Sequence, residues 1–292
     1  MRRSIVSSAL VIACGASTVS AQASAADGPV LRTRHASPAP NVKMFNPAGS
    51  VRIVGWDKDS IVVRGRVAAS EAFYFNGDDS QMKLGIDERA DGRPMARCDL
   101  VVYLPRRSQV SLKTVTGDIT ASDVSGWFYT VSGNVRLSGS ASTIEVQSMS
   151  GNVDLNVITP WAHARTGDGN LLVRGEPQDV DASTIGGTLS IASSAIVRGQ
   201  FGSVSGDVHY AGSPVSGAIF DFSNHSGAIE LLLARSVSGV FTLSSVVGSI
   251  ENGFAEVRPT ASTPHSIRLS LGRGGAQVAA RTFKGTIRLR PQ

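Results

Sequence analysis

The sequence predicts an all-β protein built as a single-stranded parallel β-solenoid, a β-helix-like stack of repeats of about 16–21 residues, preceded by a small β region. Two observations lead to this prediction. Glycine supplies 31 of the 292 residues and only 17% of residues are charged, a composition typical of short strands and tight turns. In addition, a short unit with a hydroxyl residue, a glycine and an apolar β-former recurs through the second half of the chain.

The first residues have the features of an export signal. Arg2 and Arg3 precede a short apolar stretch over 5–13, and small residues lead to an A-x-A-like cleavage site that ends at Ala21. This stretch is too short to span a bilayer, which requires about 20 residues. We therefore expect a signal peptide over 1–21, a flexible linker over 22–40, and a mature protein in the periplasm or on the outer surface of a bacterium.

Cys14 leaves a second processing route open. Residues 11–14 (Val-Ile-Ala-Cys) resemble a lipoprotein box, in which the cysteine receives a lipid anchor after cleavage. Under ordinary cleavage only Cys98 remains in the mature chain. Under either route the sequence predicts no structural disulfide.

Residues 41–110 are predicted to form N-terminal β-strands of the same domain. Apolar and polar residues alternate over 50–54 and again over 60–67, which predicts either a hairpin or one coil of a stack. A further strand over 100–104 ends at Pro105.

The repeat solenoid is predicted over 111–290. Units such as Thr116-Gly117-Asp118-Ile119 and Ser150-Gly151-Asn152-Val153 return at steps of 16–21 residues through most of this region. Such a period excludes most helical repeats, which need more than about 30 residues. The predicted corner glycines are Gly117, Gly133, Gly151, Gly167, Gly187, Gly206, Gly227, Gly248 and Gly285.

Each residue of the repeated unit has a physical role. The glycine supplies either a positive φ or room for a close backbone approach at a corner. The Asp or Asn that follows can bond the neighbouring backbone, and the next apolar residue points inward while alternate residues point to water. Because one coil cannot bury its apolar face alone, the coils have to stack about 4.8 Å apart.

These motifs resemble the bacterial putative-adhesin β-strand-repeat family, a domain family of unknown function found in exported proteins. The resemblance rests on residues 51–57 (Val-Arg-Ile-Val-Gly-Trp-Asp), on 101–105 (Val-Val-Tyr-Leu-Pro), and on the serial unit that is clearest at 114–119. It covers roughly residues 41–290. The resemblance implies an exported, adhesin-like protein and supplies no catalytic residues.

No residue pattern predicts a cofactor or a metal site. Calcium takes about six to eight oxygen ligands, whereas the repeat offers one carboxylate or amide per coil. We therefore interpret these polar residues as turn residues: Asp118, Asn134, Asn152, Asp168 and Asp207. The histidines and cysteines lack the spacing of zinc ligands.

Aromatic residues form the candidate ligand or partner surface. Trp127, Phe128 and Tyr129 are consecutive, so at least one of them faces outward if they lie on a strand. Trp161 follows Pro160. Trp127, Tyr129 and Trp161 could stack on sugars or contact a partner, or they could cap the core.

The sequence therefore predicts a non-enzymatic structural or binding protein of the cell envelope. Its expected partner is an envelope protein or a polysaccharide, and no nucleic acid. Two alternatives remain open. Asp179 and Asp181 lie two residues apart, as a carboxylate pair of a polysaccharide-acting β-helix enzyme would. An assembly scaffold would instead pair its exposed strand edges with a partner strand.

Overall fold

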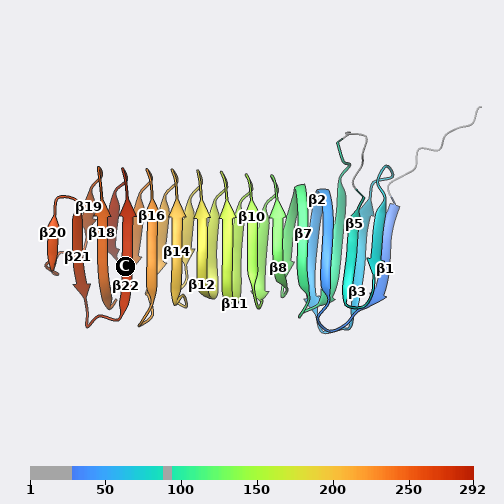
Figure 1. The fold of residues 1–292 in the computed structure, drawn as a ribbon, viewed down its shortest axis with the longest axis horizontal. Helices are drawn as coiled ribbons and strands as arrows, with labels where there is room; N and C mark the ends of the chain where they lie inside the picture. The colour runs from blue at the N-terminus through green and yellow to red at the C-terminus, as the bar shows by residue number, and fades with distance from the viewer. Residues whose placement is uncertain (1–27, 88–93) are drawn as a thin grey trace, which may run out of the picture.

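The protein is an elongated stack of β-strands (Figure 1). The computed structural model describes residues 28–87 and 94–292, and within these ranges every regular element is a strand. The predicted all-β class is therefore confirmed. No helix in the described part of the chain has the length and apolar character needed to cross a membrane. The predicted signal peptide and Cys14 lie outside the described residues.

Two walls make up the stack, and they meet at the glycine corners. Strands that precede a corner form the pre-corner wall, and strands that follow it form the post-corner wall. The long strands β2 (Asn41–Trp56), β7 (Gln109–Ser122), β11 (Val153–Thr166) and β12 (Leu171–Thr184) contribute to both walls. The pre-corner wall also contains β4 (Phe73–Gly77), β5 (Gln81–Ile86), β8 (Ser125–Thr130), β10 (Ile144–Ser148), β14 (Arg198–Ser203), β16 (Ile219–Asn224), β18 (Gly239–Ser245), β20 (Ala261–Thr263), β21 (Ser266–Leu271) and β22 (Ala276–Thr282). The post-corner wall also contains β1 (Gly28–His35), β3 (Ser60–Val67), β6 (Cys98–Pro105), β9 (Val135–Ser140), β13 (Leu189–Ala192), β15 (Val208–Gly212), β17 (Ile229–Leu233), β19 (Ile250–Asn252) and β23 (Ile287–Pro291).

Neighbouring strands in the middle of the stack pair in parallel and in register. Val153 of β11 lies opposite Val135 of β9 on one side and Leu171 of β12 on the other. Because the register keeps equivalent residues in line, the inward apolar residues of successive coils form continuous columns.

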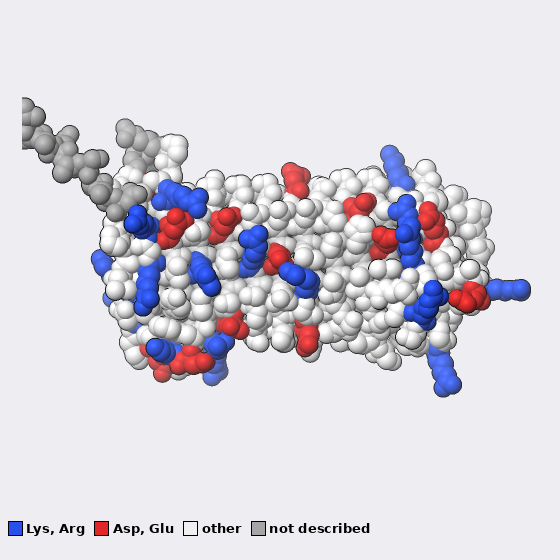
Figure 2. Space-filling view, turned by 180° about the vertical axis from the view of Figure 1, so that it is seen from behind, with Lys and Arg blue, Asp and Glu red and all other residues white. Residues whose placement is uncertain are grey.

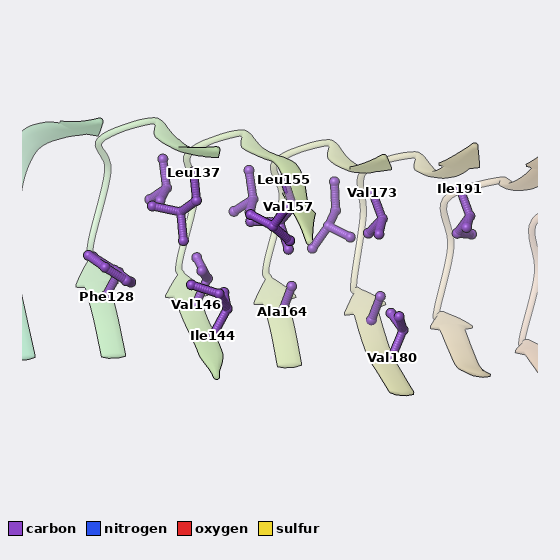
Figure 3. Packing of buried hydrophobic residues seen from close by; sticks show 14 of the residues in the cluster. Phe128, Leu137, Ile144, Val146, Leu155, Val157, Ala164, Val173, Val180 and Ile191 are labelled. Carbon is purple, nitrogen blue, oxygen red and sulfur yellow. The ribbon is translucent and has the colours of Figure 1, made fainter. Parts of the chain in front are cut away.

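The core lies between the two walls. Leu137, Leu155, Val173 and Ile191 from the post-corner wall point toward Phe128, Val146 and Ala164 from the pre-corner wall (Figure 3), and all seven are buried. The alternation of buried and exposed residues along each strand produces this arrangement, because successive side chains of a strand point to opposite faces.

The corner glycines permit a close approach between coils. From Gly117 onward none of the stacked glycines has a positive φ. Glycine is therefore required at these corners for the close backbone approach and not for a positive φ. A Cβ added at Gly151 would lie 1.8 Å from the carbonyl oxygen of Gly133. In spatial order the column is Gly49, Gly117, Gly133, Gly151, Gly169, Gly187, Gly206, Gly227, Gly285 and Gly248.

Gly169, and not the predicted Gly167, occupies the stacked position in its coil. A Cβ at Gly169 would lie 2.0 Å from the oxygen of Gly151, whereas one at Gly167 would meet the oxygen of Met149 outside the column. The prediction failed because this corner contains two glycines, and the residue that faces the coil below is set by the hydroxyl residue Thr166, three positions before Gly169.

The N-terminal end departs from a simple serial stack. Strand β2 lies between β7 on one side and β5 and β6 on the other. The strands at 50–54 and 60–67 therefore do not form a hairpin, because β6 pairs with both β2 and β3 and separates them.

Part of the predicted linker over 22–40 is a strand. Strand β1 pairs antiparallel with β3, from Gly28 opposite Val67 to His35 opposite Ser60. Most of its side chains are exposed, so β1 is held by backbone pairing at a sheet edge and lacks the alternating apolar pattern by which a strand is predicted.

The last coils are also out of chain order. β22 pairs with β16 and β18, and β23 pairs with β17 and β19. The coil of Gly285 thus lies inside the coil of Gly248, the reverse of the order expected from a serial repeat. Strand β21 then covers β18 in an antiparallel pairing.

Candidate binding surface

The structure brings the three predicted aromatic residues to the outside of one wall. On β8, Phe128 is fully buried whereas Trp127 and Tyr129 are half-buried on the outer face. Their rings stack with centroids 5.5 Å apart and planes 12° apart. The two rings therefore form one stacked pair, a half-buried aromatic surface on the outside of this wall.

Trp161 lies on the same wall, two coils away from Trp127 in a neighbouring row of side chains. It is 36% exposed, and its ring centroid is 5.6 Å from that of His163. His163 is in line with Trp127 through Glu145, because β10 pairs with both β8 and β11. The outer face of β8, β10 and β11 thus combines aromatic rings with polar groups.

The carboxylates of Asp179 and Asp181 lie on the adjoining strand β12, on the same outer face. Asp179 accepts a hydrogen bond from Arg198 at 3.3 Å, and Asp181 accepts one from Arg165 at 3.3 Å. The Nδ1 atom of His163 is 3.6 Å from Asp181. Both carboxylates are therefore engaged by cationic side chains across neighbouring coils.

A groove of about 710 Å³ runs beside Tyr129 along the corner edge of the pre-corner wall. Its apolar lining includes Met149, Ile185 and Val204, which are 58%, 57% and 49% exposed. Gly167 and Gly202 also line the groove and contribute no side chains, which leaves space along it. The groove therefore offers an apolar strip beside an aromatic surface.

The polar residues after the corner glycines hold the next coil. The Oδ1 atom of Asp118 accepts a hydrogen bond from the backbone N–H of Asn134 at 2.8 Å, and Asn134 does the same for Asn152 at 3.1 Å. Asn170 occupies this position in place of the predicted Asp168, since it accepts from Thr188 N–H at 2.9 Å. In the described part of the chain no three His, Cys, Asp or Glu residues are grouped as metal ligands.

Sequence reasoning missed two sets of residues. One is a buried hydroxyl or amide three positions before each stacked glycine, as in Thr130, whose Oγ1 accepts from Gly133 N–H at 3.0 Å. The other is the exposed apolar residue that follows it, as in Met149 and Ile185. Both sets could have been found from the sequence, because the buried residue lies three positions and the exposed apolar residue two positions before the corner glycine.

Comparison with known proteins identifies one family and several related folds. A family model described as Toastrack DUF4097 matches residues 43–290. A solved structure named as a putative adhesin from Bacteroides fragilis is 14% identical, with 90% of this chain and 97% of that chain covered and a TM-score of 0.50. One named as a putative lipid binding protein from Parabacteroides distasonis is 11% identical, with 89% and 96% covered and a TM-score of 0.51. Such low identities show a common fold alone. The comparison with curated proteins gave no match.

Proposed function

Since the chain belongs to the Toastrack DUF4097 family, we propose that it is a non-enzymatic, adhesin-like binding protein of the bacterial cell envelope. Its ligand in this proposal is a glycan that lies against the outer face of β8, β10 and β11. The stacked, half-buried rings of Trp127 and Tyr129 carry the proposal, because aromatic rings that reach solvent can contact the apolar faces of sugar rings.

The arrangement of the carboxylates supports a binding role over hydrolysis. A glycosidase directs two carboxyl groups to opposite sides of a bound glycosidic bond. Here Asp179 and Asp181 are each engaged by an arginine of a neighbouring coil, and neither is among the residues that line the groove.

Calorimetric titration with ligands selected on a glycan array tests this function. The double variant W127A/Y129A should weaken binding at least about tenfold, since each aromatic contact contributes about 0.5–1.5 kcal/mol beyond its buried area. The variant F283A is the matched control, because Phe283 is an exposed aromatic residue, 41% exposed, at a distant corner. A wild-type protein that binds no glycan, or a double variant that binds like F283A, would overturn the proposal.

Export is the second part of the proposal and has its own test. Mass spectrometry of the mature N-terminus should find a chain that begins at Gln22 after ordinary cleavage, whereas a diacylated Cys14 would show a lipid-anchored protein. A chain that retains residues 1–21 in the cytoplasm would contradict export.

The apolar groove favours a second candidate function, the binding of an acyl chain. Met149, Ile185 and Val204 form a strip that side-chain contacts leave exposed. A fluorescent fatty acid should bind with an affinity that falls in the double variant I185S/V204S and stays unchanged in W161A, because Trp161 does not line the groove. Equal fatty-acid binding by I185S/V204S and the wild-type protein would exclude this candidate.

A further inference from the structure

Three exposed arginines lie in one row of the post-corner wall, on the face opposite the aromatic surface. Arg64 of β3 and Arg52 of β2 both lie in register with Val101 of β6, which lies between them. Arg52 and Arg136 of β9 both lie in register with Thr120 of β7. Arg64, Arg52 and Arg136 therefore occupy every second strand of one row, which we call the arginine row. Figure 2 shows blue groups that run from the left of this face toward its middle.

No ion pair within the described residues engages the arginine row. All three side chains are exposed, and among the described residues no carboxylate lies within ion-pair distance of any of them. The next residue in the row, Asp154, is already bound by Arg174 through two hydrogen bonds of 2.7 and 2.9 Å. The charge of the arginine row is therefore available to an external anion.

The acidic residues beside the arginine row are also engaged within the protein. Asp99 accepts a hydrogen bond from Ser50 at 2.6 Å and one from Arg97 at 3.4 Å. Asp118 accepts from the backbone and the side chain of Asn134 at 2.8 and 3.3 Å. These carboxylates consequently repel an approaching anion less than free ones would.

Aromatic and hydroxyl groups lie along the other side of the arginine row. Tyr103 is 5.8 Å from the guanidinium carbon of Arg64 and 5.3 Å, between ring centroids, from Trp56. Ser122 and Ser138 continue the same side on the following strands. Rings, hydroxyl groups and cations together match the faces, hydroxyl groups and charges of a sugar polymer better than those of a bare inorganic anion.

We propose that the arginine row binds a linear acidic polysaccharide of the polyuronate type. Adjacent strands lie about 4.8 Å apart, so cations on every second strand repeat at about 9.6 Å. This interval is close to the length of a disaccharide, so alternate uronates of an extended chain can each meet one guanidinium. The proposal goes beyond the glycan-binding face described above and uses the opposite wall, so the two can fail independently.

The spacing of the arginine row favours this polymer over other polyanions. In a duplex nucleic acid the phosphates of each strand are about 3.4 Å apart, a much closer spacing of charges than that of the arginine row. An anionic bilayer presents its charges over a plane and attracts cations in clusters, whereas Arg64, Arg52 and Arg136 are spaced two strands apart along one row.

Binding of sodium polygalacturonate to the full chain tests the proposal. The triple variant R52Q/R64Q/R136Q should weaken binding at low salt about tenfold, as expected when three exposed ion pairs are lost. Added salt should weaken wild-type binding, because it screens exposed charges. The control R258Q/R268Q/R273Q removes the same charge from exposed arginines of the C-terminal end and should bind like the wild type. Circular dichroism establishes that both triple variants keep the wild-type fold.

Three results would overturn the proposal. The two triple variants could lose affinity equally, which would indicate a response to net charge alone. Neutral dextran could bind as tightly as polygalacturonate. Single-stranded DNA or phosphatidylglycerol vesicles could bind more tightly than polygalacturonate and depend on Arg52, Arg64 and Arg136, which would assign the arginine row to another polyanion. The variant W127A/Y129A should leave polygalacturonate binding unchanged, which separates this surface from the aromatic one.

Discussion

Replacing Gly187 with alanine should destabilise the stack strongly, whereas the same change at the neighbouring Gly186 should have little effect. A Cβ at Gly187 would lie 2.0 Å from the carbonyl oxygen of Gly169 in the adjoining coil. A Cβ at Gly186 would lie 3.2 Å from the carboxylate of Asp168, a side chain that can move, and 3.8 Å from the Cα of the same residue, an ordinary van der Waals contact. The two glycines share one corner, so they form a matched pair.

The size of the effect follows from the contacts at the corner. Relieving the clash requires the coils to separate locally by about 1.5 Å, because non-bonded heavy atoms pack at about 3.5 Å. That shift would stretch the bond from Gly187 N–H to Thr184 Oγ1, now 3.2 Å, and the one from Thr188 N–H to Asn170 Oδ1, now 2.9 Å. Overpacking costs about 1–3 kcal/mol and each lost hydrogen bond about 1 kcal/mol, so we expect a loss of about 3–5 kcal/mol.

Urea unfolding followed by circular dichroism measures the difference. The variant G187A should lose about 3–5 kcal/mol and about 10 °C in Tm, since 1 kcal/mol corresponds to about 2–4 °C in chains of this size. The variant G186A should remain within about 1 kcal/mol of the wild type, because alanine also restricts the unfolded chain. Equal stabilities for the two variants would refute the close approach of the glycine column as the constraint at these corners.

Two further predictions concern polar groups. The variant T130V should lower the free energy of unfolding in urea by about 1–3 kcal/mol, because Thr130 is fully buried and its loss leaves the N–H of Gly133 without its hydroxyl acceptor. An unchanged free energy of unfolding would show that this buried hydroxyl group does not stabilise the corner. Burial raises the pKa of Asp99, but hydrogen bonds from Ser50 and Arg97 outweigh it and hold the pKa below its usual value. The lowered pKa contributes stability at neutral pH that is lost as the pH falls through the folded-state value. The variant S50A should raise the pKa of Asp99 in an NMR titration and move the acid loss of stability to higher pH, and an unshifted titration would contradict this role of Ser50.

The local pattern of this chain could be predicted from its sequence. Glycine corners such as Gly151, inward residues such as Leu155 and outward residues such as Arg136 all follow from the alternation of a strand and from one recurring unit. The choice between Gly167 and Gly169 was missed because the buried hydroxyl three residues before each stacked glycine, Thr166 in this coil, was not recognised as part of the unit.

The pairing of strands that are distant in the sequence was harder to predict, because it also depends on backbone contacts. Strand β1 has mostly exposed side chains, and its partner β3 is fixed by backbone hydrogen bonds that leave no apolar pattern. Likewise, the units at Gly248 and Gly285 have similar local sequences. Neither sequence therefore predicts that β23, which follows Gly285, is the strand that pairs with β17. The alignment of Trp127 with His163 depends on pairing across three coils and also emerged only from the structure.

The interleaved C-terminal coils create a competition during biosynthesis. When a growing polypeptide has reached β18 but not yet β22, the edge of β16 to which β22 will bind is still open. Strand β18 can approach this edge, and it ends in the same type of glycine corner as β22. Premature docking of β18 there would form a plausible but incorrect layer, which would have to be displaced when β22 arrives. The antiparallel strand β21, made in the interval, pairs with β18 along Gly239–Ser244. Because β21 and β22 pair with opposite edges of β18, β21 leaves free the edge that competes for β16, so the correct order of layers requires β22 to insert between β16 and β18.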